Sequence, residues 1–331
     1  MRWSCAALAS VVLGTGAVPR PAGAQAADVG CRSGSALLEN ACQVTADLYQ
    51  YLAPQLAAAV SVGSPLLGGA APGGQRWSLG GRLAIVDATL PELSMASIDT
   101  GRATPADFPL VRVPLPMPSL EGSLRLPLPG ARRWGGSLDL LASVHAMPRV
   151  RTGGATVGPD GLAARFGLGA RLGIATGWRR VHTVAFSAFE RGLPRLTATG
   201  VSGGDTVELR ALQARVRGWR LTAAAHAAGL DIEAGGGADF AGTEAQIFVA
   251  LSPDRCLNQA TCRGEPFSDG FRQRLLQSHL FLSAARRAGG VTWGGEVGMA
   301  SGSGTETFNT FGGSRTSGTR WRAAFGVRVG G

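Results

Sequence analysis

The feature that most constrains this chain is a two-residue alternation in the stretch 162–176, LAARFGLGARLGIAT. Every second residue from Leu162 to Ile174 is apolar, whereas Arg165 and Arg171 share the opposite side with glycine and alanine. A period of two is that of a β-strand, because a helix repeats every 3.6 residues and would scatter the two arginines over an apolar surface. The stretch is therefore predicted to be a strand with one apolar and one polar face.

The same alternation returns at 291–300 and at 320–330, near the end of the chain. Two folds accept such strands. One is a soluble sandwich, in which the apolar faces meet in a core, and the other is a closed barrel in lipid, apolar outside and polar inside.

The sequence can be divided into strands in two ways, which differ in the proline-rich segment, and both give an even number of strands. Seven prolines in 104–130, at 105, 109, 114, 116, 118, 127 and 129, each remove a ladder donor, which predicts either a long loop or two poor strands, 108–117 and 119–128. Gly235 to Gly237 and Gly289-Gly290 are interpreted as tight turns. The regular candidate strands are 77–88, 134–148, 161–176, 179–192, 205–217, 219–233, 238–252, 272–288, 290–303 and 318–330. These give ten strands, or twelve if the proline-rich segment contributes two.

Strand length, loop length and tryptophan position favour the membrane barrel. Most of these strands are longer than the five or six residues usual in soluble proteins and can cross a bilayer at a barrel tilt. The long connections 256–270 and 305–318 alternate with the tight turns, which puts long loops on one side of the membrane and tight turns on the other. The connection 149–160 is an exception, because it is long but falls on the side of the tight turns. Tryptophans favour membrane interfaces, so a girdle at the strand ends is expected. It consists of Trp77, Trp134, Trp178, Trp219, Trp293 and Trp321.

The N-terminal region precedes the strands and is predicted to begin with a signal peptide at 1–24. Arg2 is followed by an apolar run and by the small residues Ala22-Gly23-Ala24, so the mature chain is expected to be exported. Residues 25–75 are expected to hold a periplasmic helix and a linker, with apolar residues at helical spacing over 35–61 and a stop or kink at Pro54. The helix is expected to plug or cap the barrel, or simply to pack against it.

Export places four cysteines of the mature chain in an oxidising compartment, where neighbouring pairs form disulfides. The expected bridges are Cys31–Cys42 and Cys256–Cys262. Metal binding is the alternative, but neither pair has CxxC spacing or a histidine nearby. No metal site and no cofactor are predicted.

These features together resemble bacterial outer-membrane β-barrel proteins. The resemblance rests on the signal peptide, the alternating strands and the terminal strand RWRAAFGVRVGG, and it covers most of 76–331. It is one of pattern, and the chain departs from the family's aromatic C-terminus because it ends on Gly331. It implies an all-β fold, a transmembrane antiparallel barrel of 10–12 strands over 76–331, located in the outer membrane and in contact with its lipid.

Composition argues against a nucleic-acid partner. The 331 residues contain no lysine, and their 32 basic residues against 22 acidic ones give a net charge of +10. The arginines are spread singly along the strands, whereas a nucleic-acid binder would gather them in a patch or tail.

The polar strand faces are expected to line the barrel interior and to decide the function. They supply Arg82, Asp139, His145, Arg165, Arg171, Arg220, His226, Glu244, Glu296, Arg322 and Arg328. In a wide barrel the surplus arginine favours a passive channel for small anionic or amphiphilic solutes. In a narrow one the charges pair and plug the interior, which leaves a structural or partner-binding barrel acting through its external loops.

A hydrolase built from Ser143, His145 and Asp139 is the third hypothesis, and it is not favoured. Residues i and i+2 of one strand project in parallel about 7 Å apart, too far for the hydrogen bond between a nucleophile and its base. The chain is thus expected not to be an enzyme, while its solute and oligomeric state stay open.

Overall fold

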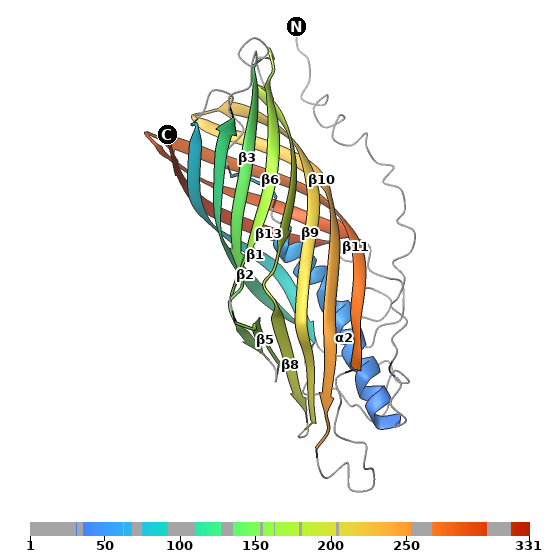
Figure 1. Cartoon of the computed structure of the whole chain (residues 1–331). Helices are drawn as coiled ribbons and strands as arrows, with labels where there is room; N and C mark the ends of the chain where they lie inside the picture. The colour runs from blue at the N-terminus through green and yellow to red at the C-terminus, as the bar shows by residue number, and fades with distance from the viewer. Residues whose placement is uncertain are drawn as a thin grey trace.

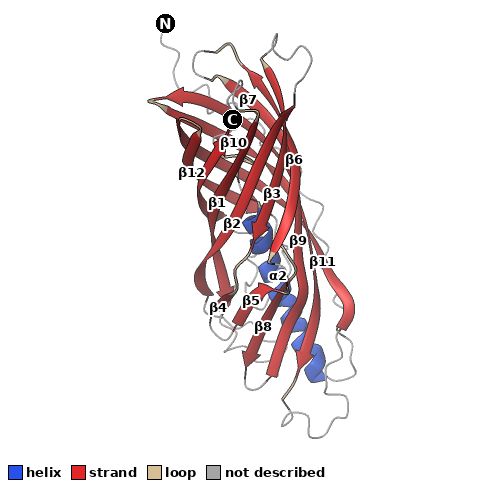
Figure 2. Ribbon diagram, turned by 60° about the vertical axis from the view of Figure 1, so that its left-hand side comes forward, coloured by secondary structure: helices blue, strands red, loops and turns tan. Residues whose placement is uncertain are grey.

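The structure, a computed structural model, describes most of the chain after the first thirty residues. It covers residues 31, 36–61, 63–67, 75–91, 110–126, 135–152, 155–161, 163–178, 181–202, 205–252, 267–302 and 319–331. The expected signal peptide, Trp134, Cys256 and Cys262 lie outside these residues. Within them, one helix is surrounded by a single antiparallel sheet (Figures 1 and 2). None of the described helical residues forms a helix that is both long and apolar enough to span a membrane.

Ten strands close into a barrel, since β9 pairs with β10 at the seam of the sheet. They are β1 (Trp77–Pro91), β2 (Leu110–Leu126), β3 (Gly136–Ala146), β6 (Ala164–Ala175), β7 (Thr183–Gly192), β9 (Asp205–Ala227), β10 (Leu230–Ala250), β11 (Phe267–Ala288), β12 (Val291–Gly302) and β13 (Arg320–Gly330). Three short strands extend the wall beside β9, namely β4 (Val150–Thr152), β5 (Ala155–Pro159) and β8 (Leu196–Ser202). The predicted all-β barrel is confirmed.

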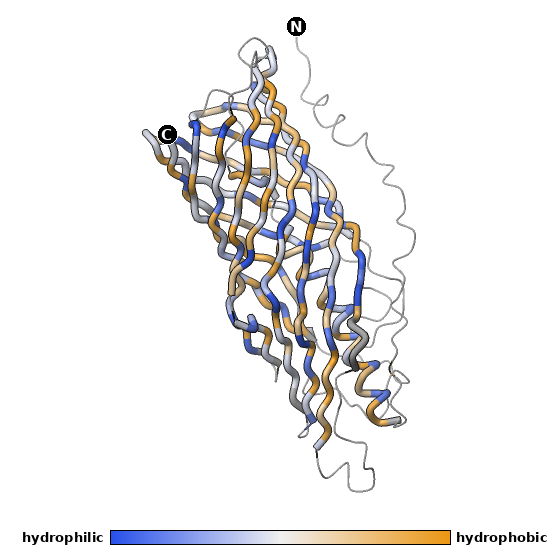
Figure 3. The backbone as a smooth tube through the Cα atoms, in the orientation of Figure 1, coloured by the Kyte–Doolittle hydropathy of each residue, from blue (hydrophilic) through white to orange (hydrophobic). Residues whose placement is uncertain are grey.

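Alternation along the strands gives the barrel an apolar outside, and Figure 3 shows hydrophobic and hydrophilic residues alternating along the chain. The outward residues include Phe166, 75% exposed, and Leu168, 70% exposed. We call the outward set the apolar belt; its other large members are Trp77, Leu79, Leu83, Ile85, Leu120, Leu124, Leu140, Leu172, Ile174, Phe186, Trp219, Leu221, Phe240, Leu280, Leu282, Trp293, Val297, Trp321, Phe325, Val327 and Val329. A soluble sandwich would bury these side chains, so the belt excludes that alternative.

Residues 205–250 form two strands, and the predicted division into three was wrong. The turn lies at Ala228 and Gly229, which both have positive φ, and the Gly235–Gly237 stretch is inside β10. Gly237 is needed there because a Cβ atom would overlap the carbonyl of Trp219 on β9. The expected number of ten strands nevertheless holds, because β2 replaces the strand lost by this merger.

Having two strands instead of three over 205–250 also accounts for the long connection 149–160, which the sequence had placed on the side of the short turns. The strand ends that flank 127–135, 176–182, 228–229 and 289–290 lie at one end of the barrel, which we call the short-turn end. The strand ends that flank 92–109, 147–163, 193–204, 251–266 and 303–319 lie at the other, the long-loop end. The long connection after β3 therefore belongs with the other long loops.

The proline-rich segment forms one strand, β2, rather than a loop or two poor strands. Pro114, Pro116 and Pro118 are alternate residues, so their missing N–H groups all belong to one edge of the strand. This edge is unpaired there, because β2 pairs with β1 along its whole length but with β3 only from Ser119 onward. The prolines thus occupy the only side of the strand that needs no donors.

Helix α2 (Ala36–Val60) runs inside the barrel, where it contacts β1, β2, β9, β10 and β11 (Figures 1 and 2). The expected helix is present, but it lies inside the barrel and not in the periplasm. Pro54 does not end it, since the helix continues to Val60. Around it the wall supplies an apolar core toward the long-loop end. Its members include Leu193, Leu196, Leu209, Leu212, Ile247, Val249, Phe271 and Leu275.

Candidate functional site: the plugged barrel interior

The helix is fixed to the barrel wall by polar side chains as well as by apolar packing. Tyr49 Oη lies 2.8 Å from Thr243 Oγ1, and Tyr51 Oη lies 2.7 Å from Thr89 Oγ1. Gln55 donates to the carbonyl of Thr89 at 2.8 Å and accepts from its backbone N–H at 2.7 Å. These contacts fix the position of α2 against both β1 and β10.

After α2 the chain continues through the interior toward the short-turn end. Ser61 bonds to Asp239, farther along the interior Ser64 donates to Glu233 and Glu296, and at the short-turn end Gln75 donates to the carbonyl of Gly330. The N-terminal end of α2 consequently lies toward the long-loop end. Residues 61 and 63–67 therefore lie inside the barrel.

The interior beyond the helix contains buried ion pairs. Arg220 donates to both carboxylate oxygens of Asp239, at 2.5 and 2.9 Å, and His279 Nε2 lies 2.9 Å from Oδ2. Arg82 lies 3.0 Å from Glu296 and also donates to the carbonyl of Ser64 at 2.7 Å. The segment that follows α2 is therefore part of the charged network.

A third cluster joins β2, β3 and β6. Asp139 accepts from Arg125 Nε and from Arg171 Nη2, each at 2.8 Å. In this region the wall buries six arginines and five carboxylates, so the charges nearly balance, as buried charges must. They are Arg82, Arg171, Arg191, Arg220, Arg322, Arg328, Glu121, Asp139, Glu233, Asp239 and Glu296.

The structure distributes the eleven expected lumen residues over three environments. Eight are buried inside the barrel, namely Arg82, Asp139, His145, Arg171, Arg220, Glu296, Arg322 and Arg328. Arg165 is half-buried and donates to Gln213 at 3.0 Å. Their burial is a matter of geometry and does not by itself assign them a function.

The remaining two expected lumen residues lie elsewhere. His226 is exposed at the end of β9, 3.0 Å from Asp231, because the strand there has reached the rim. Glu244 faces outward, because Thr243 and Ala245 on either side of it face inward and are buried. Both assignments to the interior were wrong.

Sequence reasoning missed several interior residues, among them Glu121, Arg191, Glu233 and Asp239. Two of these lay beside the supposed Gly235–Gly237 turn and one in the proline-rich segment, where no strand face had been assigned. Continuing the alternation without a break through 230–250 would have placed Glu233 and Asp239 on one face.

The Ser143 and His145 side chains are closer than strand geometry led us to expect. His145 Nε2 lies 2.9 Å from Ser143 Oγ, since the imidazole ring bends back along the strand. Both residues are buried in the interior, and Asp139 is bonded to arginines instead of to the histidine. Asp139 therefore does not orient this pair, and the predicted 7 Å separation was wrong.

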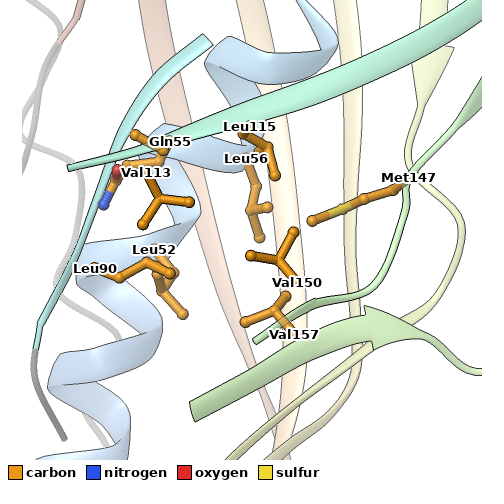
Figure 4. A pocket seen from close by; sticks show the side chains of 10 residues that line it. Leu52, Gln55, Leu56, Leu90, Val113, Leu115, Met147, Val150 and Val157 are labelled. Atoms are coloured by element: carbon orange, nitrogen blue, oxygen red, sulfur yellow. The ribbon is translucent and has the colours of Figure 1, made fainter. Parts of the chain in front are cut away.

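An apolar pocket lies where the β2 edge faces β4 without pairing (Figure 4). Its lining comes from α2, β1, β2, β4 and β5 and includes Leu52, Leu56, Leu115, Met147 and Val157. Gln55 is the sole polar residue among those that line it. The helix thus covers the unpaired stretch of wall from the inside.

The described tryptophans occupy different heights. Trp77, Trp178 and Trp293 lie at the short-turn end, and Trp321 starts β13 at the long-loop end. Trp219 is within β9 and not at a strand start, as a result of the merged strands.

At the N-terminal end of α2, the predicted Cys31–Cys42 disulfide is present, with Cα atoms 5.7 Å apart. No group of three potential metal ligands occurs among the described residues.

Comparisons with known proteins return only structural likeness. No family model matches the chain, and no curated protein matches it. The translocator domain of autotransporter NalP from Neisseria meningitidis matches at 9% identity and TM-score 0.36, over 78% of this chain and 89% of that one. Escherichia coli outer membrane phospholipase A follows at 12% and 0.28, over 84% and 98%. Acinetobacter baumannii Omp33 gives 10% and 0.23, over 78% and 98%. These values carry no functional argument.

The membrane assignment comes from the barrel itself. A closed antiparallel barrel with a continuous apolar belt and a polar interior is the architecture of bacterial outer-membrane proteins. Lipid covers the belt, and the protein is an outer-membrane barrel.

Proposed function

We propose that this protein is a closed outer-membrane barrel that binds a partner at its long-loop end, with α2 as its resident plug. The occupied interior carries the proposal. A solute pathway needs a water-filled pore, whereas here α2 and the residues after it hydrogen-bond to the wall. Beyond them, buried ion pairs form around Asp139, Asp239 and Glu296. An open passive channel, the function that the sequence predicted first, requires that volume to be free.

The projecting wall supports a binding role for the long-loop end. β9, β10 and β11 contain 23, 21 and 22 residues, whereas about 9–11 residues cross a membrane. Beyond the apolar belt their outer faces carry exposed polar side chains, among them Arg210, Arg215, Gln246 and Arg272. A water-exposed wall of this kind offers a firm surface to which a partner can bind.

A gated anion channel is the second candidate. Its support is the six buried arginines, which would line a net basic pore if α2 and residues 63–67 were displaced. The two candidates differ in whether the helix ever leaves the barrel.

Planar-bilayer conductance of the full mature chain separates them. We expect no conductance from the folded wild type. A variant with Tyr49→Cys and Thr243→Cys, joined by a short bismaleimide, fixes α2 to β10, and the same variant without the linker is its control. Channel events in the control that vanish on crosslinking would establish the gated channel, and steady anion conductance from the wild type would refute the closed barrel.

Orientation is tested on intact cells with two exposed arginines at opposite ends, Arg210→Cys and Arg287→Cys. Long loops face outward in outer-membrane barrels, so a membrane-impermeant maleimide should label position 210 at once and position 287 only after permeabilisation. The reverse pattern would contradict a partner-binding surface on the outside.

A further inference from the structure

On the part of the wall formed by β7, β9, β10 and β11, the strand register shows where the apolar belt ends. One row of neighbours contains Ala188, Trp219 and Ala238. The next row toward the long-loop end contains Glu190, Arg217 and Phe240.

The two rows beyond are polar. Arg215 and Arg274 flank Gly242 in the first, and Gln213, Glu244 and Arg272 form the second. With Arg217 and Glu190 of the preceding row, four arginines and two glutamates lie at this boundary of the belt, which leaves a net positive strip where the hydrocarbon of the membrane ends.

A hollow in the outer surface adjoins this strip. It is lined by Leu168, Ala188, Trp219 and Phe240, with Glu190 and Arg217 at the edge nearest the long-loop end. The small side chain of Ala188 forms its floor, because it lies beside Trp219 in the register and is surrounded by bulkier belt residues.

Arg217 at the edge of the hollow and Arg215 in the next row share one carboxylate. Glu190 accepts from Arg217 at 2.9 Å and lies 3.6 Å from Arg215, while these two arginine side chains are 71% and 56% exposed. One negative charge cannot neutralise two guanidinium groups, so the edge retains donors and positive charge that face the membrane surface.

We propose that this hollow and its arginines form a binding site for a lipid with a phosphate-bearing headgroup, from the leaflet at the long-loop end. An acyl chain lies over Ala188 between Leu168, Trp219 and Phe240. The headgroup phosphate accepts from Arg215 and Arg217, whose planar, multiply donating guanidinium groups suit phosphate oxygens. The site is independent of whether the barrel interior is closed.

Trp219 provides a local probe. The full chain is reconstituted into phosphatidylcholine vesicles containing a minor fraction of brominated-chain lipid, either phosphatidylglycerol or phosphatidylcholine, at the same mole fraction. The Trp219 contribution to quenching is the difference between the wild type and Trp219→Phe. We expect stronger quenching by the brominated phosphatidylglycerol.

Two double variants locate the preference. Arg215→Gln with Arg217→Gln should weaken the preference for the anionic lipid, by about fivefold for each arginine removed. Arg286→Gln with Arg287→Gln, at the opposite end, should leave Trp219 quenching unchanged. Equal quenching by both brominated lipids in the wild type, or equal loss in both double variants, would overturn the site.

A final experiment distinguishes a lipid ligand from a free anion. Inorganic phosphate is added to the wild type in vesicles that contain the brominated phosphatidylglycerol. Retained quenching supports a lipid ligand, because the acyl chain contributes to binding. Complete loss of the preference at low phosphate would show that the arginines take the free ion, and the lipid assignment would be wrong.

Discussion

Asp239 is the residue whose replacement tests the interior network most directly. It accepts two hydrogen bonds from Arg220, contacts His279, and bonds to Ser61 at the end of the plug. Both members of the Asp239–Arg220 pair have fully buried side chains. Asp239→Asn keeps the size of the side chain but removes its charge, and leaves the Arg220 guanidinium without an anion.

The expected cost is large. Breaking a buried ion pair by removing one partner costs about 3–5 kcal/mol. Such a loss reduces the folding equilibrium constant by more than a hundredfold, since about 1.4 kcal/mol corresponds to tenfold. The matched control, Glu190→Gln, breaks exposed pairs with Arg215 and Arg217 on the outer face, and exposed pairs contribute about 0–1 kcal/mol.

Urea unfolding of the protein from lipid vesicles, followed by tryptophan fluorescence, measures both variants. The transition of Asp239→Asn should shift to lower urea with an unchanged slope, as for a stability change without altered exposed surface. Addition of Arg220→Gln should recover part of the loss, because the two residues act as a pair. Equal, small shifts for Asp239→Asn and Glu190→Gln would refute the buried network.

Three further predictions concern the plug, the wall and the free edge. Burial raises the pKa of Tyr49 and Tyr51, which are the only tyrosines of the chain and both lie on α2, so a tyrosinate absorbance titration should have its midpoint above the ordinary value of about 10. The stability gained by burying the two neutral phenols is present below pH 10 and declines as the pH rises above it. A titration midpoint of the folded protein equal to that of the protein unfolded in guanidinium would mean that α2 is outside the barrel. Gly237→Ala should destabilise the barrel by about 1–3 kcal/mol in the same urea assay because its Cβ meets the Trp219 carbonyl, whereas Gly242→Ala on the same strand has open space and should be neutral. Pro116→Thr restores a donor on the unpaired edge of β2 and should increase self-association measured by light scattering, and unchanged association would show that the edge is otherwise protected.

The candidate site was only partly accessible from the sequence. Alternation put Arg82 and Arg220 on the faces that the structure buries, but it failed for Glu244, because beyond the apolar belt the inner face of β10 is apolar and the outer face is polar. It also gave no means of finding the Ser61–Asp239 contact, which joins residues 178 positions apart. Local periodicity states which face a residue occupies and is silent about its neighbours on other strands.

The sequence by itself determined most strand faces, the apolar belt, a helix within 35–61 and the Cys31–Cys42 bridge, because each depends on short-range spacing. Tertiary structure alone decided what fills the interior. Closure of ten strands set the register that brings Asp239 between Arg220 and His279, and it fixed an inner volume that α2 occupies. The same polar faces would line an open pore around a wider barrel, so the difference between pore and plug lies in barrel closure and in the path of the chain before β1.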